Sequence, residues 1–260
     1  MTPLIFPLLL SLSPLALDSA PATLPVDPAQ SLTQLGQIVV RSTGAIEADV
    51  TAFRALLGNP ANGALPGHQP SGHREINWDG VPAALTNSIH FPNNFFNVNS
   101  PRGLVYDQVN RGLEVSDNRF TNLNPTYAAE FNPFSGTKLF APLGNSESDV
   151  RFFVAGSTEP AAVRGFGVVF SDVDKDGLSG FEALAEDGTI LGRYFAPVRS
   201  DARGVSFVGV VFRNPVIARV RINAGEGYMA PDQLDISQGG QFDLVVMDDF
   251  LYGEPTATGL

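Results

Sequence analysis

The stretch that decides the fold is Val163-Arg164-Gly165-Phe166-Gly167-Val168-Val169-Phe170-Ser171-Asp172-Val173. Its even positions carry the bulky Phe166, Val168 and Phe170, whereas the odd positions carry the bare Gly165 and Gly167. Alternation of this kind is typical of a β-strand, and glycine inside a strand marks a place where another element approaches the backbone closely. The sequence therefore predicts a strand that is buried on both faces.

A second stretch, residues 242–251, has no polar face at Leu244, Val245, Val246 and Met247, which is typical of a central strand. Asp187-Gly188 is a strong hairpin signal between two shorter apolar segments. Many short strands without helical intervals predict an antiparallel β-sandwich of jelly-roll type. The further predicted strands are residues 75–78, 103–106, 113–116, 138–140, 150–154, 181–185, 190–195, 205–212 and 217–222.

The N-terminus has the pattern of an export signal. Residues 3–17 are apolar, and Ala20-Pro21-Ala22 fits a cleavage site with small residues, although no Lys or Arg precedes the apolar run. The run is too short to span a bilayer as a helix. We therefore expect residues 1–22 to be a signal peptide, and a secreted, periplasmic or cell-surface protein that begins near Thr23.

Residues 23–73 are expected to be a lead-in that contains one helix at residues 45–57. Ile46, Val50, Phe53 and Leu57 form one apolar stripe at helical spacing, Thr43 is a candidate N-cap, and Gly58 ends the pattern. A Gly- and Pro-rich loop follows to residue 73. The β-sandwich domain is expected at residues 74–255, and residues 256–260 form a tail without a hydrophobic anchor.

Composition excludes several classes of function. The 260 residues carry a formal net charge of −11 and contain no basic run, so the electrostatic footprint of a nucleic-acid-binding protein is missing. With no cysteine, disulfides, zinc–thiolate sites and cysteine nucleophiles are excluded. No G-x-S-x-G motif is present. We expect no nucleic-acid partner and no membrane span, and the sequence says nothing about oligomeric state.

Asp172-x-Asp174-x-Asp176-Gly177 matches the first half of an EF-hand calcium loop. The second half fails because position 12 of the loop is Ala183 and both flanks are predicted strands. Two alternatives remain, a calcium site of another kind or a solvated acidic turn. For Asp176 the solvated turn is favoured.

Asp248 and Asp249 follow the apolar part of the second buried stretch, where a carboxylate needs a cation or a hydrogen-bond donor. If the two buried strands are neighbours with their ends aligned, these two residues meet Asp172 and Asp174. The sequence then predicts one structural calcium ion held by Asp172, Asp174, Asp248 and Asp249. The alternative is that Arg219 or Arg221 neutralises the carboxylates.

Trp78-Asp79 is a candidate ligand-binding pair, because a tryptophan beside a carboxylate can stack on a sugar and hydrogen-bond to it. The more common alternative is a core tryptophan followed by an aspartate in a turn.

Four blocks of sequence carry a resemblance. They are Arg74-Glu75-Ile76-Asn77-Trp78-Asp79-Gly80-Val81-Pro82, Phe95-Phe96-Asn97 with Ser100-Pro101-Arg102-Gly103, Gly165-Phe166-Gly167-Val168-Val169-Phe170-Ser171-Asp172-Val173-Asp174, and Met247-Asp248-Asp249-Phe250-Leu251-Tyr252-Gly253-Glu254-Pro255. With these blocks in order, the chain resembles a group of exported bacterial proteins to which no activity is assigned. More loosely, the acidic C-terminal strand is similar to that of calcium-stabilised jelly-roll carbohydrate-binding modules.

We therefore expect an exported, non-catalytic module that binds a glycan or another surface polymer and contains calcium. One alternative is a glycan-active hydrolase or lyase, which needs two carboxylates at a set separation. The other is a structural envelope protein.

Overall fold

The computed structural model describes residues 36–107, 112–199, 201 and 203–259. The expected signal peptide, residues 1–22, and the expected start of the mature chain near Thr23 lie outside these ranges. None of the helices in the described part of the chain is long and apolar enough to cross a membrane.

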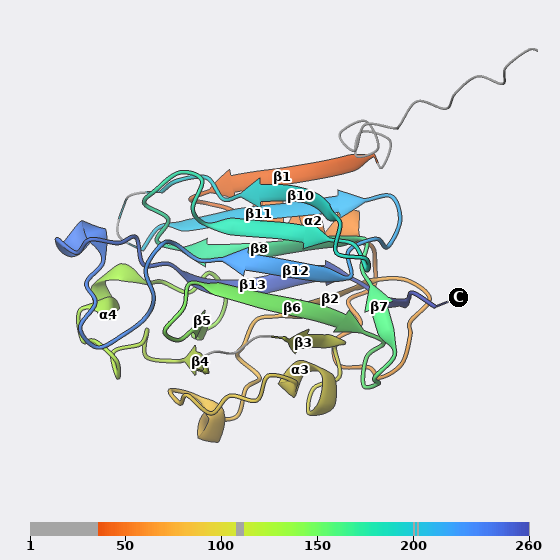
Figure 1. Ribbon diagram of the computed structural model, residues 1–260, viewed down its shortest axis with the longest axis horizontal. Helices are drawn as coiled ribbons and strands as arrows, with labels where there is room; N and C mark the ends of the chain where they lie inside the picture. Colours follow the sequence, from red (N-terminus) through yellow and green to blue (C-terminus); the bar gives the residue numbers. More distant parts are fainter. Residues whose placement is uncertain (1–35, 108–111, 200, 202, 260) are drawn as a thin grey trace, which may run out of the picture.

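Two antiparallel sheets pack face to face, which confirms the predicted β-sandwich (Figure 1). The first sheet has the strand order β1 (Gln37–Thr43), β11 (Val205–Phe212), β8 (Gly165–Ser171), β13 (Val246–Gly253), β5 (Leu139–Pro142) and β4 (Leu113–Ser116), with β2 (His73–Ile76) paired to β13. The second has the order β10 (Ile190–Phe195), β9 (Gly180–Leu184), β12 (Arg219–Asn223), β6 (Glu147–Phe153), β7 (Pro160–Ala162) and β14 (Thr256–Ala257), with β3 (Leu104–Tyr106) paired to β6.

Every predicted strand overlaps an observed one, but β1, β7 and β14 were not predicted. β1 falls within the segment expected to be a loose lead-in, and β14 lies in the expected tail, so the sandwich extends beyond residues 74–255 at both ends. β1 is an edge strand whose side chains are exposed or only half-buried. A strand of this kind shows no alternation of apolar and polar residues, which explains why the sequence pattern does not reveal it.

The predicted helix is α2 (Glu47–Leu57), which covers the outer face of the first sheet. Its stripe of Ile46, Val50, Phe53 and Leu57 is buried, as expected. Gly58 ends the helix at φ 116°, and its N–H donates to the carbonyl of Arg54. Ile46, not the expected Thr43, is the N-cap residue, because Thr43 is the last residue of β1.

Four further short helical segments were not predicted. They are the helices α3 (Phe95–Val98) and α4 (Tyr127–Glu130) and the 3₁₀ helices η1 (Ala83–Leu85) and η2 (Ile236–Gln238). α3 lies in the asparagine-rich span of residues 93–99.

The two glycines of β8 admit α2. A Cβ atom added at Gly167 would lie 2.7 Å from Cε1 of Phe53, and one added at Gly209 on the neighbouring strand would lie 2.5 Å from Cε2 of the same ring. Gly167 and Gly209 are register partners across β8 and β11. A Cβ atom added at Gly165 would lie 2.7 Å from Cδ2 of Leu57, so the close approach predicted from the bare positions is that of Leu57 and Phe53 of α2.

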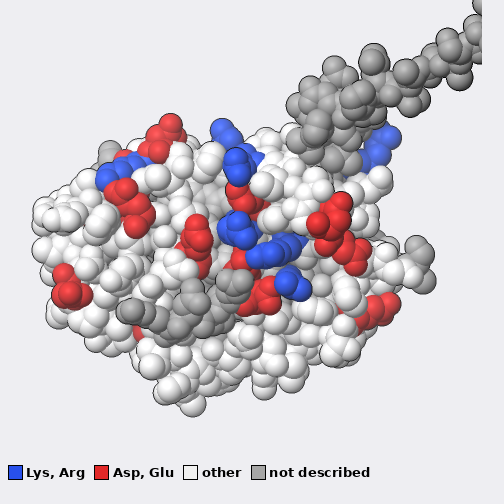
Figure 2. All heavy atoms as spheres, viewed as in Figure 1, with Lys and Arg blue, Asp and Glu red and all other residues white. Residues whose placement is uncertain are grey.

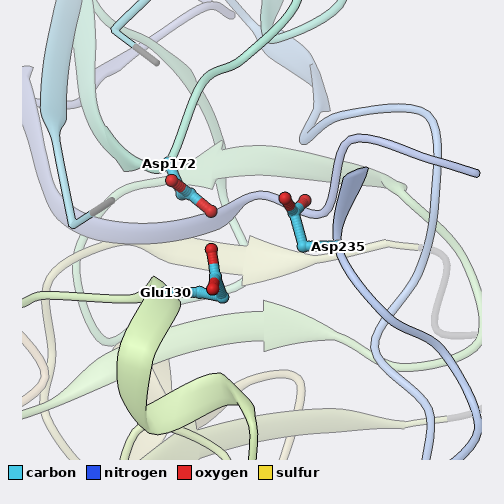
Figure 3. A group of neighbouring side chains, drawn as sticks. All are labelled: Glu130, Asp172 and Asp235. Atoms are coloured by element: carbon cyan, nitrogen blue, oxygen red, sulfur yellow. The ribbon is translucent and has the colours of Figure 1, made fainter. Parts of the chain in front are cut away.

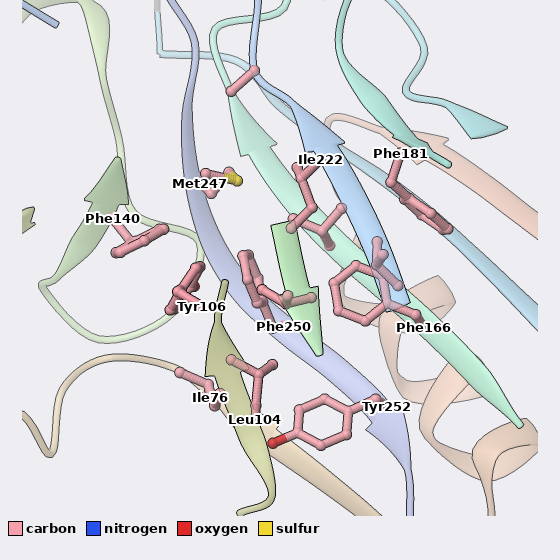
Figure 4. Close-up of a cluster of buried hydrophobic side chains, with 14 of the residues drawn as sticks. Ile76, Leu104, Tyr106, Phe140, Phe166, Phe181, Ile222, Met247, Phe250 and Tyr252 are labelled. Atoms are coloured by element: carbon pink, nitrogen blue, oxygen red, sulfur yellow. The ribbon is translucent and has the colours of Figure 1, made fainter. Parts of the chain in front are cut away.

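The opposite face of β8 lines the core between the two sheets. Phe166 points into this core, together with Phe250 and Tyr252 of β13 and Ile222 of β12 (Figure 4). Phe170 belongs to the same buried cluster. β8 is therefore buried on both faces along its whole length, as its sequence predicts.

A buried ion pair joins two of the sequence blocks. Arg74 is fully buried, and its guanidinium donates to both carboxylate oxygens of Glu254 at 2.7 Å. The same guanidinium also donates to the carbonyls of Gly63, Leu65 and Pro101, which fixes the Gly- and Pro-rich loop against the sandwich. A charge that is buried this deeply needs such a complete set of partners.

We predict that Gly209→Val lowers the free energy of unfolding by about 1–3 kcal/mol, because the added methyl groups collide with Phe53 and overpack the layer between α2 and the sheet. Chemical denaturation measures the change. Gly80→Ala is the matched control, because a Cβ atom at Gly80 meets no other atom within 4 Å. Equal stability of the two variants would contradict this account of the packing.

Candidate metal centre

The site begins where β8 ends. Asp172 follows the last residue of this doubly buried strand and is only 1% exposed. Its backbone adopts φ 72°, and its N–H donates to the carbonyl of Gly204 at 2.8 Å. No donor among the described residues reaches either oxygen of its carboxylate. A buried carboxylate in this state is costly unless a proton or a cation accompanies it.

Two other buried carboxylates approach Asp172. Ligand atoms of Glu130, Asp172 and Asp235 all lie within 4.8 Å of one another, and the side chains of Glu130 and Asp172 point toward each other (Figure 3). Glu130 is the last residue of α4, and its Oε2 accepts from the hydroxyl of Ser237. Asp235 is the N-cap of η2, and its two oxygens accept from the N–H groups of Ser237 and Leu244.

A second group adjoins the first and shares Asp235 with it. Ligand atoms of Asp174, Asp235 and Asp243 also lie within 4.8 Å of one another. Asp243 is fully buried, and its Oδ2 accepts from the N–H groups of Asp174 at 3.2 Å and Lys175 at 3.0 Å. Its Oδ1 has no donor among the described residues, and neither does Oδ1 of Asp174.

Burial and mutual repulsion raise the pKa values of Asp172, Asp174 and Asp243. The pKa of Asp172 is raised to about 9, first by burial and then by the charges of Asp235, Asp174 and Glu130. The pKa of Asp243 rises to about 7 and that of Asp174 to about 6, in both cases mainly through burial. Within the described ranges, no ion pair joins any of these carboxylates to Arg, Lys or His. The donor set is all oxygen and strongly anionic, which suits a hard divalent cation.

The structure brings together part of the predicted ligand set. Asp172 and Asp174 belong to the two groups, whereas Asp248 and Asp249 belong to neither. The two buried strands are indeed neighbours, but they run antiparallel, so the end of β8 meets the start of β13, with Ser171 opposite Val246. Asp243, which precedes β13, therefore reaches Asp174, while Asp248 and Asp249 lie further along the strand.

Asp248 and Asp249 meet a different part of the chain. They occupy an irregularity in the β13 register, and both contact the loop before β5. Asp248 accepts from the N–H groups of Phe134 and Ser135, and Asp249 accepts from the hydroxyl of Ser135. Burial raises the pKa of both carboxyls, and that of Asp248 lies well above its ordinary value.

The arginines expected near these carboxylates lie elsewhere. Arg219 and Arg221 both contact Asp149 on the second sheet. The arginine nearest to Asp249 is Arg54 of α2, at 3.5 Å, which also pairs with Glu75.

The three site residues that sequence reasoning missed differ in the signal they leave. Asp243 lies within the predicted strand at residues 242–251, where a single acidic residue among apolar ones is a weak signal. Asp235 precedes Ile-Ser in the pattern of a helix N-cap. Glu130 leaves no signal in the sequence. Asp176 is exposed, in agreement with the solvated turn favoured for it.

Trp78 lies in the core. Its ring is 1% exposed and stacks on Phe140 with ring centroids 4.1 Å apart, and its indole N–H donates to the carbonyl of Asp248. Asp79 accepts from the N–H of Thr137 in a turn. The ring offers no exposed face on which a sugar could stack, and the geometry is that of the alternative, a core tryptophan followed by a turn aspartate.

Comparison of the chain with protein-family models, with curated proteins and with solved structures gave no match in any of the three.

We predict that, in the presence of a chelator, the melting temperature falls as the pH is raised from 5 to 9. A carboxyl with a raised pKa in the folded state stabilises the fold below its unfolded pKa, and this stabilisation is lost as the pH passes through the folded values of about 6, 7 and 9 for Asp174, Asp243 and Asp172. Asp172→Asn should flatten the fall above pH 7. Asp176→Asn, an exposed residue of the same loop, is the control, and identical pH profiles for the two variants would contradict the prediction.

Proposed function

We propose that the chain is a non-catalytic β-sandwich module of an exported protein that binds calcium and presents the outer face of its second sheet to an extracellular polymer. The observation that carries the calcium part is Asp172, a buried carboxylate without a hydrogen-bond donor among the described residues that lies within reach of Glu130 and Asp235.

Calcium is the cation that fits this set of ligands best. The two groups offer carboxylate oxygens and contain no histidine, and the chain has no cysteine, so the softer metals lack their preferred ligands. Calcium accepts six to eight oxygens in an irregular arrangement, and extracellular calcium is abundant enough to fill a weak site. Asp172, Asp174, Asp235 and Asp243 would hold the ion with Glu130, and it would neutralise their charge.

Burial argues against a catalytic role for the same carboxylates. A general acid or nucleophile must contact its substrate, whereas Asp172, Asp235 and Asp243 are at most 1% exposed. A structural role suits their position, because the carboxylates come from α4, from the loop after β8 and from the long connection between β12 and β13. One bound cation would fasten these separate segments at the end of the sandwich where β8 ends and α4 lies (Figure 1).

The polymer part is supported by the outer face of the second sheet. Side chains of both signs gather there (Figure 2), among them the exposed Arg151 of β6, Arg193 of β10 and Arg221 of β12. Arg193 and Arg221 are held in place by the carboxylate of Glu182. A hollow of about 210 Å³ is lined by Glu182, Arg193 and Arg221 together with the aromatic Phe181 and Phe195. Fixed donors and acceptors on an extended sheet suit a hydroxyl-rich chain such as a glycan.

We predict that calcium raises the melting temperature of the wild-type chain relative to chelator, by an amount that corresponds to about 2.7 kcal/mol when calcium is at a hundredfold excess over its dissociation constant. Asp172→Asn should lose part of this gain because it removes a buried ligand, whereas Asp176→Asn should retain all of it. Thermal melts with calcium, magnesium and chelator measure the effect. An unchanged melting temperature of the wild-type chain would contradict calcium binding.

We also predict that the wild-type chain retains members of a glycan array without cleaving them, and that Arg193→Ala and Arg221→Ala weaken this binding. Arg41→Ala, on the edge strand of the other sheet, is the control. Product analysis of the bound glycans completes the test. Turnover would favour the hydrolase or lyase, and the absence of both binding and turnover would favour a structural envelope protein.

A further inference from the structure

The carboxylate cluster consists of two groups that share only Asp235. A single cation would neutralise one group and leave the other without a partner. We infer that the cluster holds two calcium ions, one in the group of Glu130, Asp172 and Asp235 and the other in the group of Asp174, Asp235 and Asp243, with Asp235 bridging the two. This inference rests on the proposed calcium binding and specifies its stoichiometry and its ligands.

The distances between the carboxylate oxygens fit two separate ion sites. Calcium–oxygen bonds are about 2.3–2.6 Å long, so two oxygens on the same ion lie at most about 5 Å apart. Each group of three meets this condition, with its ligand atoms within 4.8 Å of one another. The groups have only Asp235 in common. Each group therefore has the dimensions of one ion site.

Each group contains its own buried carboxylate oxygen that has no donor among the described residues. In the first group these are both oxygens of Asp172, which is 1% exposed, and in the second it is Oδ1 of Asp243, which is fully buried. A cation in the first group alone leaves Oδ1 of Asp243 and Oδ1 of Asp174 without a partner, and a cation in the second group alone leaves both oxygens of Asp172 without one.

The hydrogen bonds that Asp235 accepts leave it able to bridge two ions. Each of its two oxygens accepts one backbone N–H, from Ser237 to Oδ2 and from Leu244 to Oδ1. A carboxylate oxygen has a further lone pair beyond the first hydrogen bond. The two N–H groups fix the plane of the carboxylate and leave both of its oxygens able to bind a cation, which is the requirement for a bridging ligand.

The net charge of the five carboxylates also favours two ions over one. The two groups together comprise five carboxylates, and no Lys, Arg or His of the described chain pairs with them. One calcium ion leaves three negative charges in a largely buried space, whereas two ions leave a single one. Buried charge that is not neutralised is strongly unfavourable, so the second ion completes what the first begins. The rival is that the carboxyls share protons and bind no second ion.

Isothermal titration calorimetry of the chelator-treated full chain with calcium chloride, together with elemental analysis after desalting, measures the stoichiometry. We expect two ions per wild-type chain. Glu130→Gln should leave one ion, in the group of Asp243, and Asp243→Asn should leave one ion, in the group of Asp172. Asp235→Asn should weaken both sites, and Asp176→Asn, the exposed control in the same loop, should retain two ions.

One ion per wild-type chain would overturn the two-ion site and leave the proposed calcium binding intact, whereas no bound ion would overturn both. A measurement on the wild-type chain avoids dependence on variants that fail to fold. Terbium and europium loaded together should show energy transfer between the two lanthanides, because the two sites share a ligand. Absence of transfer at full occupancy would overturn the shared site.

Discussion

Burial of β8 on both faces is the constraint on which the rest of the structure depends. One face has bare glycines against which Leu57 and Phe53 of α2 pack, and the other carries Phe166 and Phe170 into the core between the sheets. A strand enclosed in this way places the residue after it inside the molecule as well. Asp172 is therefore surrounded by protein and not by water. The charge of its carboxylate has to be neutralised by groups in the surrounding loops or by a bound cation.

The antiparallel pairing of β8 with β13 determines which carboxylates lie beside Asp172. Since the end of β8 lies beside the start of β13, the loops that lead out of one strand and into the other occupy the same end of the sandwich. Asp174 lies in the loop that follows β8, and Asp243 lies in the segment that precedes β13. The long connection from β12 adds Asp235, whose carboxylate accepts the backbone N–H of Ser237 in η2 and that of Leu244.

The sequence predicts the elements of this fold better than their arrangement. The alternation in β8 and the apolar stripe of α2 are local patterns, and both predict the observed burial. β1 was missed because an edge strand with one neighbour and no buried face has no such pattern. For the site, the D-x-D spacing identifies Asp172 and Asp174, but Glu130 and Asp235 join them only through tertiary contacts. The prediction that included Asp248 and Asp249 depended on aligned strand ends, which an antiparallel pair does not have.

The two buried acidic clusters differ in the means available to neutralise them, and this difference is the strongest reason to assign the cation to Asp172 and its neighbours. Asp248 and Asp249 receive two backbone N–H groups, the hydroxyl of Ser135 and the nearby guanidinium of Arg54. Oδ1 of Asp248 has no donor among the described residues, and burial, followed by the charge of Asp249, raises the pKa of Asp248 well above its ordinary value, which favours a proton on this pair. The cluster of five carboxylates that includes Asp235 has no arginine partner within the described part of the chain, and Asp172 has no hydrogen-bond donor there either. Protons alone could neutralise that cluster only if several of its carboxyls stayed protonated together. A divalent cation neutralises the same carboxylates without that requirement.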